Sequence, residues 1–299
     1  MKSEIQLRNE QVRIRILPER GGKIASVFDL RRSFELLYQP AGEYPPLRPG
    51  MAFSDGDASG FDDVFPSMGE RWRDPVSGQE PVLPDHGEIW TSRMTVDAVT
   101  EETVRMHTFG QCFPFRYDKE LTLLPRGVRE RITVTGLGKD PFPCLWVCHC
   151  LMRYEAGMRF EFPEAAEAIE CVPGCSWPPE GAVPSALSEL PVPPPSGTMM
   201  KFWFREPVKS GECRAVYPGS GVQAILRFAP KQLPYLGFWM TNGGYRGEHN
   251  FAFEPASGYY DTLEKAKETG TLPLLRPGES KIYETEIEIG LPFQRSGVP

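Results

Sequence analysis

The chain has 299 residues, of which 40% are hydrophobic and 24% are charged, so it contains enough apolar side chains for a packed core and is not a disordered chain. Its formal net charge of −7 excludes the basic surface that nucleic-acid binding requires. The length fits one large all-β domain or two ordinary ones, and we expect a single domain over residues 1–299.

The first ten residues, Met1–Glu10, are mostly polar and contain no apolar stretch of the kind found in signal peptides, so we expect no signal peptide. The sequence has no run of 18 apolar residues, so we expect no membrane-spanning helix. Its seven cysteines are an odd number in a chain that is too long to depend on disulfides. We therefore expect reduced thiols in a cytoplasmic protein that is a monomer or a homodimer.

Short segments in which apolar and polar residues alternate recur along the chain, and 31 prolines and 29 glycines separate them. This pattern is typical of half-buried strands joined by turns. Because helical patterns are few, the sequence predicts an all-β protein, a large antiparallel β-sandwich with few short helices. The clearest strands are expected at Val12–Leu17, Val104–Phe109, Lys119–Leu124, Arg129–Thr135 and Lys281–Ile289.

One short helix is predicted over Asp261–Gly270. Asp261 is placed to cap its N-terminus, Glu264 follows three residues later, and Gly270 ends the run. A different irregular stretch, Val172–Gly197, is dense in proline and is expected to be a long surface excursion between strands. Such a loop either borders a functional site or is a passive insertion.

The first candidate site residue is His86, which lies in a turn marked by Pro84 and Gly87. Asp85 beside it would favour the protonated imidazole. Trp90, four residues later, offers a flat apolar face that suits the C–H face of a sugar ring. The alternative interpretation is a surface turn with a solvated histidine.

A second candidate, His149, lies in the almost entirely apolar run Pro143–Tyr154, which reads as a strand covered on both faces. Alternation places His149 on the face opposite to Cys148 and Cys150, so the three residues do not form a metal site. A buried imidazole needs a partner. His149 is therefore either a hydrogen-bonded core residue or a proton donor at the floor of a concave sheet.

The third candidate is Glu254, which shares a strand face with Asn250 and lies opposite to Phe251 and Phe253. Pro255 holds it in an extended conformation, so one carboxylate projects away from the apolar layer. A glutamate at the solvent-exposed rim is the alternative.

Aromatic residues and further carboxylates accompany these candidates. Trp239 and Tyr245 lie just upstream of Glu254, and either could form a sugar platform or belong to the core. Asp62 and Asp63 lie beside aromatic residues in Phe61–Phe65.

Taken together, these segments resemble the galactose mutarotase-like superfamily, specifically a divergent branch of the aldose 1-epimerase family. Asp85–Trp90 is similar to the histidine-glycine motif of that family, and Phe253–Gly258 is similar to its glutamate-proline motif. The strand of His149 takes the place of the second family histidine. Leu17–Asp29 and Leu275–Ser280 resemble the first hairpin and the turn before the last strand.

The resemblance implies a supersandwich whose site lies in the concave face, and it implies roles for three residues. His86 would help to position a free hexose or related sugar, His149 would protonate the ring oxygen, and Glu254 would take the proton of the anomeric hydroxyl. Ring opening, rotation and reclosure would then interconvert the anomers without a cofactor or a metal. We also expect sugar contacts from Asp85, Trp90, Trp239 and Asp62.

This sequence departs from the standard members of the family at two places. Leu83–Asp85 replaces an asparagine-rich context before the first histidine, and Cys148 and Cys150 replace polar neighbours of the second. Three alternatives therefore stay open. The first is a non-catalytic carbohydrate-binding protein. The second is a sugar-phosphate epimerase, which would need an arginine cluster such as Arg71, Arg73 and Arg93.

The third alternative is a glycoside hydrolase or lyase, which would need a second carboxylate across the pocket from Glu254. Asp62, Asp63 or Asp85 would have to supply it. This arrangement would leave the histidines without a role.

Overall fold

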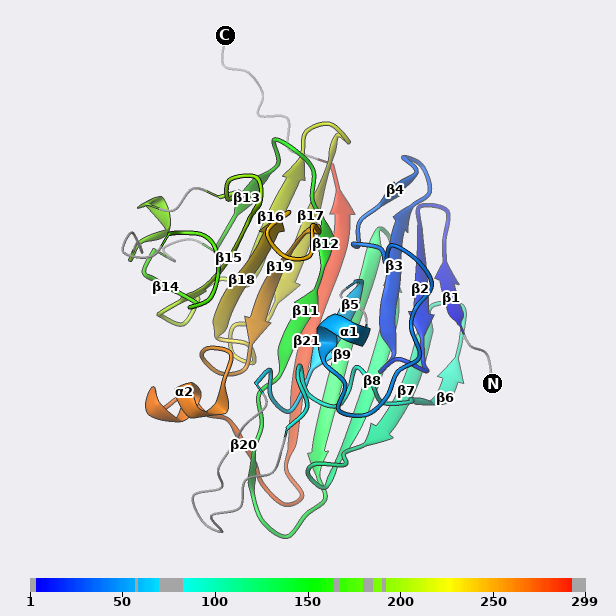
Figure 1. Cartoon of the computed structure of the whole chain (residues 1–299). Helices are drawn as coiled ribbons and strands as arrows, with labels where there is room; N and C mark the ends of the chain where they lie inside the picture. Colours follow the sequence, from blue (N-terminus) through cyan, green and yellow to red (C-terminus); the bar gives the residue numbers. More distant parts are fainter. Residues whose placement is uncertain are drawn as a thin grey trace.

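The computed structural model describes residues 4–56, 59–69, 83–163, 167–179, 185–189 and 192–291. Two large antiparallel sheets stack face to face in these residues, with the apolar core between them (Figure 1). The antiparallel β-sandwich predicted from the sequence is confirmed. No helix in the described ranges is long and apolar enough to cross a membrane.

Within the described residues, the first sheet has eleven strands, nine of them in one continuous hydrogen-bonded series. β12 (Met152–Arg153) pairs with β19 (His249–Ala256), and β4 (Phe34–Glu35) pairs with β3 (Lys23–Asp29). The order of the nine is β1 (Ile5–Arg8), β2 (Val12–Leu17), β3 (Lys23–Asp29), β5 (Phe61–Val64), β11 (Val147–Cys150), β19 (His249–Ala256), β18 (Tyr235–Asn242), β15 (Thr198–Phe204) and β14 (Ile169–Cys171).

The second sheet has eight strands in the same part of the chain. Their order is β13 (Arg159–Glu161), β16 (Glu212–Tyr217), β17 (Val222–Phe228), β21 (Ser280–Gly290), β9 (Gly127–Gly136), β8 (Phe115–Leu124), β7 (Thr103–Phe109) and β6 (Thr95–Val99). The remaining elements are a small β10–β20 ladder (Phe142–Pro143 with Leu274–Leu275), α1 (Phe53–Gly56), a 3-10 turn (Leu187–Glu189) and α2 (Leu263–Glu268).

Alternation along each strand explains the two layers. In β19, Phe251 and Phe253 are fully buried in the core between the sheets, whereas Asn250 and Glu254 point to the opposite face, as the sequence predicts. All five strand segments singled out in the sequence are strands in the structure. One face of the first sheet is therefore left to be covered by loops and by α1, which lies in front of it (Figure 1).

The predicted short helix is present as α2, but its predicted cap is wrong. Thr262 is the N-cap residue, and its hydroxyl accepts a hydrogen bond from the backbone N–H of Lys265 at 3.2 Å. Asp261 lies one residue before the cap, and its carboxylate reaches Lys201 Nζ at 2.8 Å. The acid that we expected to start the helix therefore faces a cavity.

The proline-rich stretch runs along the β14–β15 edge where it is described. The backbone N–H of Val172 donates to Lys201 O, and the backbone N–H of Trp177 donates to Met199 O. The expected surface excursion thus lies beside β15, the strand that carries Lys201. No described residue of 172–197 lines the cavity presented below.

Candidate functional site

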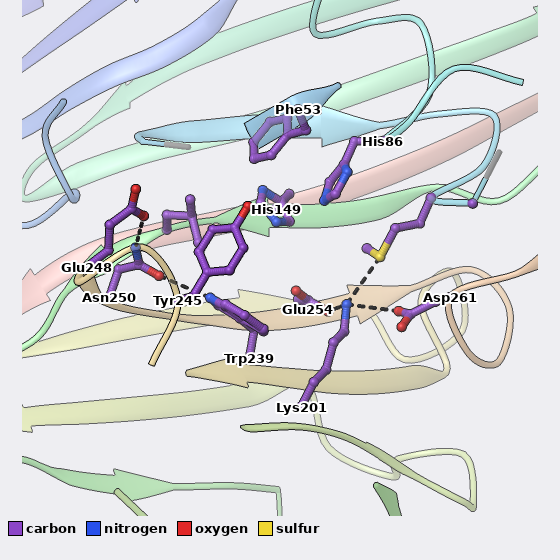
Figure 2. Close-up of a pocket in the computed structure, with 13 residues that line it drawn as sticks. Phe53, His86, His149, Lys201, Trp239, Tyr245, Glu248, Asn250, Glu254 and Asp261 are labelled. Carbon is purple, nitrogen blue, oxygen red and sulfur yellow. Dashed lines mark hydrogen bonds and ion pairs between the residues drawn. The ribbon is translucent and has the colours of Figure 1, made fainter. Parts of the chain in front are cut away.

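The face of the first sheet that is turned away from the core carries a cavity of about 330 Å³. Four neighbouring strands form its floor: β11 contributes His149, β19 contributes Asn250 and Glu254, β18 contributes Trp239, and β15 contributes Lys201. Figure 2 shows these side chains converging beneath Phe53 and His86. The volume is at the lower end of the range for small-molecule sites.

His149 is 5% exposed and points into this cavity, whereas Cys148 and Cys150 lie in the core on the other side of β11. The predicted alternation is therefore confirmed. His149 Nδ1 is buried without a hydrogen-bond partner among the described residues. Burial, together with the nearby His86, Lys201 and Lys23, holds the pKa of His149 well below its usual range, so the imidazole is neutral near neutral pH.

Glu254 is 1% exposed, and its Oε2 lies 2.9 Å from Lys201 Nζ. Its Oε1 accepts no hydrogen bond from any described residue. Burial raises the pKa of Glu254, and Lys201 opposes that rise. One oxygen of the carboxylate is thus held by an ammonium group, and the other is left to accept a proton.

The two proton-transfer candidates come from adjacent strands. β11 pairs with β19 through Val147 and Ala256. His149 lies two residues after Val147, and Glu254 lies two residues before Ala256, so alternation directs both side chains to the same face. Both line the cavity (Figure 2).

Lys201 was not among the predicted site residues. Its Nζ lies 2.9 Å from Glu254 and 2.8 Å from Asp261, and it donates to Met68 Sδ at 3.1 Å. Burial alone would lower the pKa of Lys201, but Asp261 and Glu254 raise it above its ordinary value. The signal in the sequence was a single charged residue at the start of the apolar run Lys201–Phe204.

Gly237 provides the space in which Glu254 and Trp203 sit. It pairs with Glu254 across β18 and β19. A β-carbon at position 237 would lie 3.1 Å from Glu254 Oε2 and 3.0 Å from the Trp203 ring. The absence of a side chain at this position therefore determines where the carboxylate can lie.

His86 lines the cavity from a loop whose backbone is left-handed at two successive residues, with φ of 58° at His86 and 75° at Gly87. A β-carbon at Gly87 would lie 2.1 Å from Phe65 O, so only glycine fits there. The His86 ring stacks on Phe53 with centroids 4.2 Å apart. This geometry explains why a glycine follows His86 in the sequence.

Asp85 orients the loop and does not line the cavity. Its Oδ1 lies 2.7 Å from His86 Nδ1, and its Oδ2 accepts a hydrogen bond from the backbone N–H of Phe53 at 2.8 Å. Burial acts to raise the pKa of Asp85, but the contacts with the His86 side chain and with the backbone N–H groups of Phe53 and His86 together outweigh it and lower the pKa. Asp85, which we expected to contact a sugar, contacts His86 instead. Because Asp85 occupies Nδ1 of the imidazole, Nε2 is the ring nitrogen left to face the cavity.

Trp90 also lies outside the cavity, although we expected it to stack on a sugar. It is 2% exposed, its Nε1 donates to Asp85 O at 2.9 Å, and its ring packs edge-on against Phe53 at 5.1 Å. A β-carbon at Gly56 would collide with this ring. Trp90 therefore supports α1 from beneath.

Asp62 and Asp63 point to opposite faces of β5, and neither lines the cavity. Asp62 is the register partner of His149 but forms an ion pair with Lys23 at 2.5 Å. Asp63 pairs with Lys119 in the core at 2.9 Å. Since Asp62, Asp63 and Asp85 all lie outside the cavity, none of them provides the second carboxylate of a glycoside hydrolase.

Trp239 and Tyr245 both line the cavity, with ring centroids 5.7 Å apart and nearly perpendicular planes. Trp239 Nε1 donates to Asn250 Oδ1 at 3.0 Å, which holds the indole in place. The cavity thus combines two aromatic walls with polar groups, a composition typical of small-molecule sites.

Of the three arginines considered for phosphate recognition, Arg93 is the one that lies in the described residues. Arg93 pairs with Glu19 at 2.9 Å on the surface, with 57% of its side chain exposed. Arg71 and Arg73 lie outside the described residues. Among the residues that are described, no group of three or more His, Cys, Asp or Glu is arranged to hold a metal ion.

In sequence, the chain matches no protein-family model and no curated protein. Solved structures with a similar fold include Slr1438 from Synechocystis sp. PCC 6803, a galactose mutarotase related enzyme from Lactobacillus acidophilus and a candidate aldose 1-epimerase from Escherichia coli K12. Their TM-scores are 0.74, 0.73 and 0.70, at 14%, 13% and 17% sequence identity. Each comparison covers 96% of this chain. The covered share of the solved structure is 96%, 97% and 99%, in the same order.

The similarity thus extends over nearly the whole length of each chain. At these identities it concerns the fold alone. This protein therefore has the galactose mutarotase-like fold of aldose 1-epimerase family proteins.

Proposed function

We propose that the protein interconverts the anomers of a free sugar, as an aldose 1-epimerase does. The observation that carries the proposal is that His149 and Glu254 face one small cavity from adjacent strands. Trp239 and Tyr245 supply apolar walls for the C–H faces of a pyranose ring, and His86 and Asn250 supply polar contacts for its hydroxyls. The candidate aldose 1-epimerase of Escherichia coli K12 has the same fold, which supports this choice of reaction.

The reaction needs two balanced proton transfers. Glu254 takes the proton of the anomeric hydroxyl while the bond between C1 and the ring oxygen breaks, and His149 gives a proton to that oxygen. The open-chain aldehyde rotates about its first carbon–carbon bond. The reverse transfers then close the ring as the other anomer and restore both side chains.

The two groups together carry one proton in each productive state. That proton is on His149 when the sugar is cyclic and on Glu254 when it is open. Burial lowers the pKa of His149 and raises the pKa of Glu254, so both shifts favour the state in which Glu254 holds the proton. This state matches the ring-closing step, and anomer exchange runs through closing as often as through opening.

A free sugar fits the charges of the cavity better than a sugar phosphate does. Lys201 is the only Lys or Arg among the described lining residues, and it already contacts Glu254 and Asp261. Glu248 adds a third carboxyl group to the wall. A phosphate dianion would therefore meet more negative charge than positive charge.

The test is NMR measurement of anomer exchange with purified protein over a panel of free aldoses. We expect exchange of at least one sugar to be accelerated, and His149→Asn and Glu254→Gln each to reduce the rate by on the order of 10²-fold or more. Matched controls are His107→Asn and Glu120→Gln, two residues in surface ion pairs on the other sheet. Equal rates for the site variants and the wild type would refute the assignment.

Binding of a sugar without catalysis is the second candidate function. It is favoured by the low pKa of His149, because a neutral imidazole is a poor acid. In that case saturation-transfer NMR would detect sugar contacts, while anomer exchange would proceed at the rate of the buffer alone.

A further inference from the structure

Lys201 and Asp261 line the cavity beside Glu254, and the proposed proton transfers give neither of them a role. Lys201 Nζ lies 2.9 Å from Glu254 Oε2 and 2.8 Å from Asp261 Oδ1, so the ammonium group sits between two carboxylates (Figure 2). Lys201 also donates to Met68 Sδ at 3.1 Å, but a thioether is a weak acceptor. The two carboxylates are therefore the groups that compensate this buried cation.

Asp261 is fixed by contacts that do not involve Glu254. Its Oδ1 accepts a hydrogen bond from Trp203 Nε1 at 3.2 Å, and Trp203 lies two residues after Lys201, on the same face of β15. The backbone is left-handed at Tyr260, with φ of 76°, and Thr262 caps α2 directly after Asp261. A residue other than glycine keeps such a conformation only where its surroundings impose it. Asp261 is thus an anchored counter-ion.

Glu254 depends on Lys201 for its position. The ammonium group lies against Oε2, on the side where Gly237 leaves room for that oxygen. Because Asp261 in turn holds Lys201, the series Asp261–Lys201–Glu254 fixes one oxygen of the carboxylate and leaves the other oriented for the anomeric hydroxyl.

The charge of this cluster changes in every turnover of the proposed reaction. When Glu254 takes the proton of the anomeric hydroxyl, its carboxylate becomes neutral and Lys201 loses one of its two counter-ions. A buried cation without any counter-ion is strongly unfavourable. The contact with Asp261 keeps Lys201 paired in that state, so Glu254 can accept and return a proton without leaving the ammonium group unpaired.

The two residues act on Glu254 in opposite directions. The titratable side chains that line the cavity with Glu254 are, among the described residues, His86, His149, Lys201, Tyr245, Glu248 and Asp261. Burial has the largest effect and raises the pKa of Glu254, Lys201 lowers it, and Asp261 raises it. The pair therefore keeps Glu254 able both to take up and to release a proton.

We propose that Lys201 and Asp261 are positioning residues for Glu254: Lys201 holds the carboxylate in place, and Asp261 keeps Lys201 paired while Glu254 carries the proton. Their part in turnover rests on the proposed function, whereas their effect on Glu254 can be measured without any reaction.

The first test is a double-mutant cycle in anomer exchange. Lys201→Met removes the charge and should lower kcat by on the order of 10²-fold with little change in KM, because a displaced base affects the chemical step. Asp261→Asn should lower kcat by about tenfold, because protonation of Glu254 then leaves Lys201 without a counter-ion. The double variant should be about as slow as Lys201→Met alone, since Asp261 acts through Lys201.

The second test follows the ionisation of Glu254 by ¹³C NMR of its side-chain carboxyl carbon, whose signal is identified by its loss in Glu254→Gln. Lys201→Met should raise the pKa of Glu254, and Asp261→Asn should lower it. Asp261→Asn changes a side chain that is 18% exposed, so it is expected to fold even if Lys201→Met does not.

The matched controls carry the same substitutions in ion pairs outside the cavity. Lys265 lies 3.1 Å from Glu170 beside the cavity region, and Asp118 lies 2.7 Å from Arg116 on the other sheet. Lys265→Met and Asp118→Asn should each retain the wild-type kcat and the wild-type titration of Glu254.

A raised KM in Asp261→Asn, together with losses of kcat that add in the double variant, would show that Asp261 contacts the sugar itself and would overturn the positioning role. A Glu254 titration that neither variant moves would overturn it as well. If the titration moves as expected but the wild type does not accelerate anomer exchange, the proposed reaction is refuted and the action of the pair on Glu254 is retained.

Discussion

Two buried lysines in this protein each contact two carboxylates, yet they serve different regions. Lys119 lies between the two sheets, with its Nζ 2.9 Å from Asp63 and 2.8 Å from Glu130. Lys201 lies on the cavity floor, at 2.9 Å from Glu254 and 2.8 Å from Asp261. The charged groups are the same in kind and spacing.

Solvent access is what separates the two clusters. The Lys119 side chain and both of its partners are at most 1% exposed, and Tyr117 donates a further hydrogen bond to Asp63 at 3.0 Å. In the Lys201 cluster, the side chain of the lysine is 11% exposed and that of Asp261 is 18% exposed, and both line the cavity together with Glu254. The closed cluster ties Asp63 of one sheet to Lys119 of the other, whereas the open cluster forms part of the wall of the cavity.

The largest effect on stability is expected from Lys119→Met. This change leaves two carboxyl groups in the core without their cation, which typically costs about 3–5 kcal/mol. Lys201→Met should cost less, because Asp261 can turn to water. Urea unfolding of both variants measures the difference, and an equal loss of stability would show that the comparison does not hold.

Gly237→Ala is expected to have an intermediate effect confined to the cavity side. The added methyl group would press on Glu254 Oε2 and on the Trp203 ring, an overpacking that typically costs about 1–3 kcal/mol. The rate of anomer exchange should fall as the carboxylate is displaced. Gly42→Ala is the control, since its methyl group would meet nothing within 4 Å, and it should match the wild type in both measurements.

The pH dependence of anomer exchange sharpens the assignment of the open cluster. Activity requires one proton on the His149–Glu254 pair, so it should decline at low pH, where the pair takes up a second proton, and at high pH, where the pair loses its only proton. Lys201 lowers the pKa of Glu254 and Asp261 raises it. Lys201→Met should therefore move the alkaline limb to higher pH, and Asp261→Asn should move it to lower pH. If the alkaline limb moved in the same direction in both variants, Lys201 and Asp261 would not act on the pKa of Glu254 in the opposite ways described here.

The closed cluster is also expected to make the free energy of unfolding depend on pH. Burial raises the pKa of Glu130 to about 8. Between the ordinary glutamate pKa and this value, the folded protein holds a proton that the unfolded chain releases, so the free energy of unfolding should fall as pH rises through that window. Glu130→Gln should remove this slope in urea unfolding curves. A slope that persists in the variant would assign it to another group.

The sequence alone determined the strands and the face on which each side chain lies. Strict alternation in β11 and β19 predicted that His149 and Glu254 point away from Cys148 and Phe253, and the structure agrees. The turn residues Pro84 and Gly87 likewise predicted that His86 lies in a loop.

Only the tertiary structure decided which groups surround the side chains on each of those faces. Alternation could not separate Asp62 from a sugar site, because the lysine that neutralises it, Lys23, comes from a different strand. Alternation also could not predict that Lys201 contacts Glu254, because packing rather than local pattern sets the order of β15, β18 and β19 in the sheet. The period of a strand fixes the direction of a side chain relative to its own backbone, whereas its partner, its burial and therefore its pKa depend on segments far away in the chain.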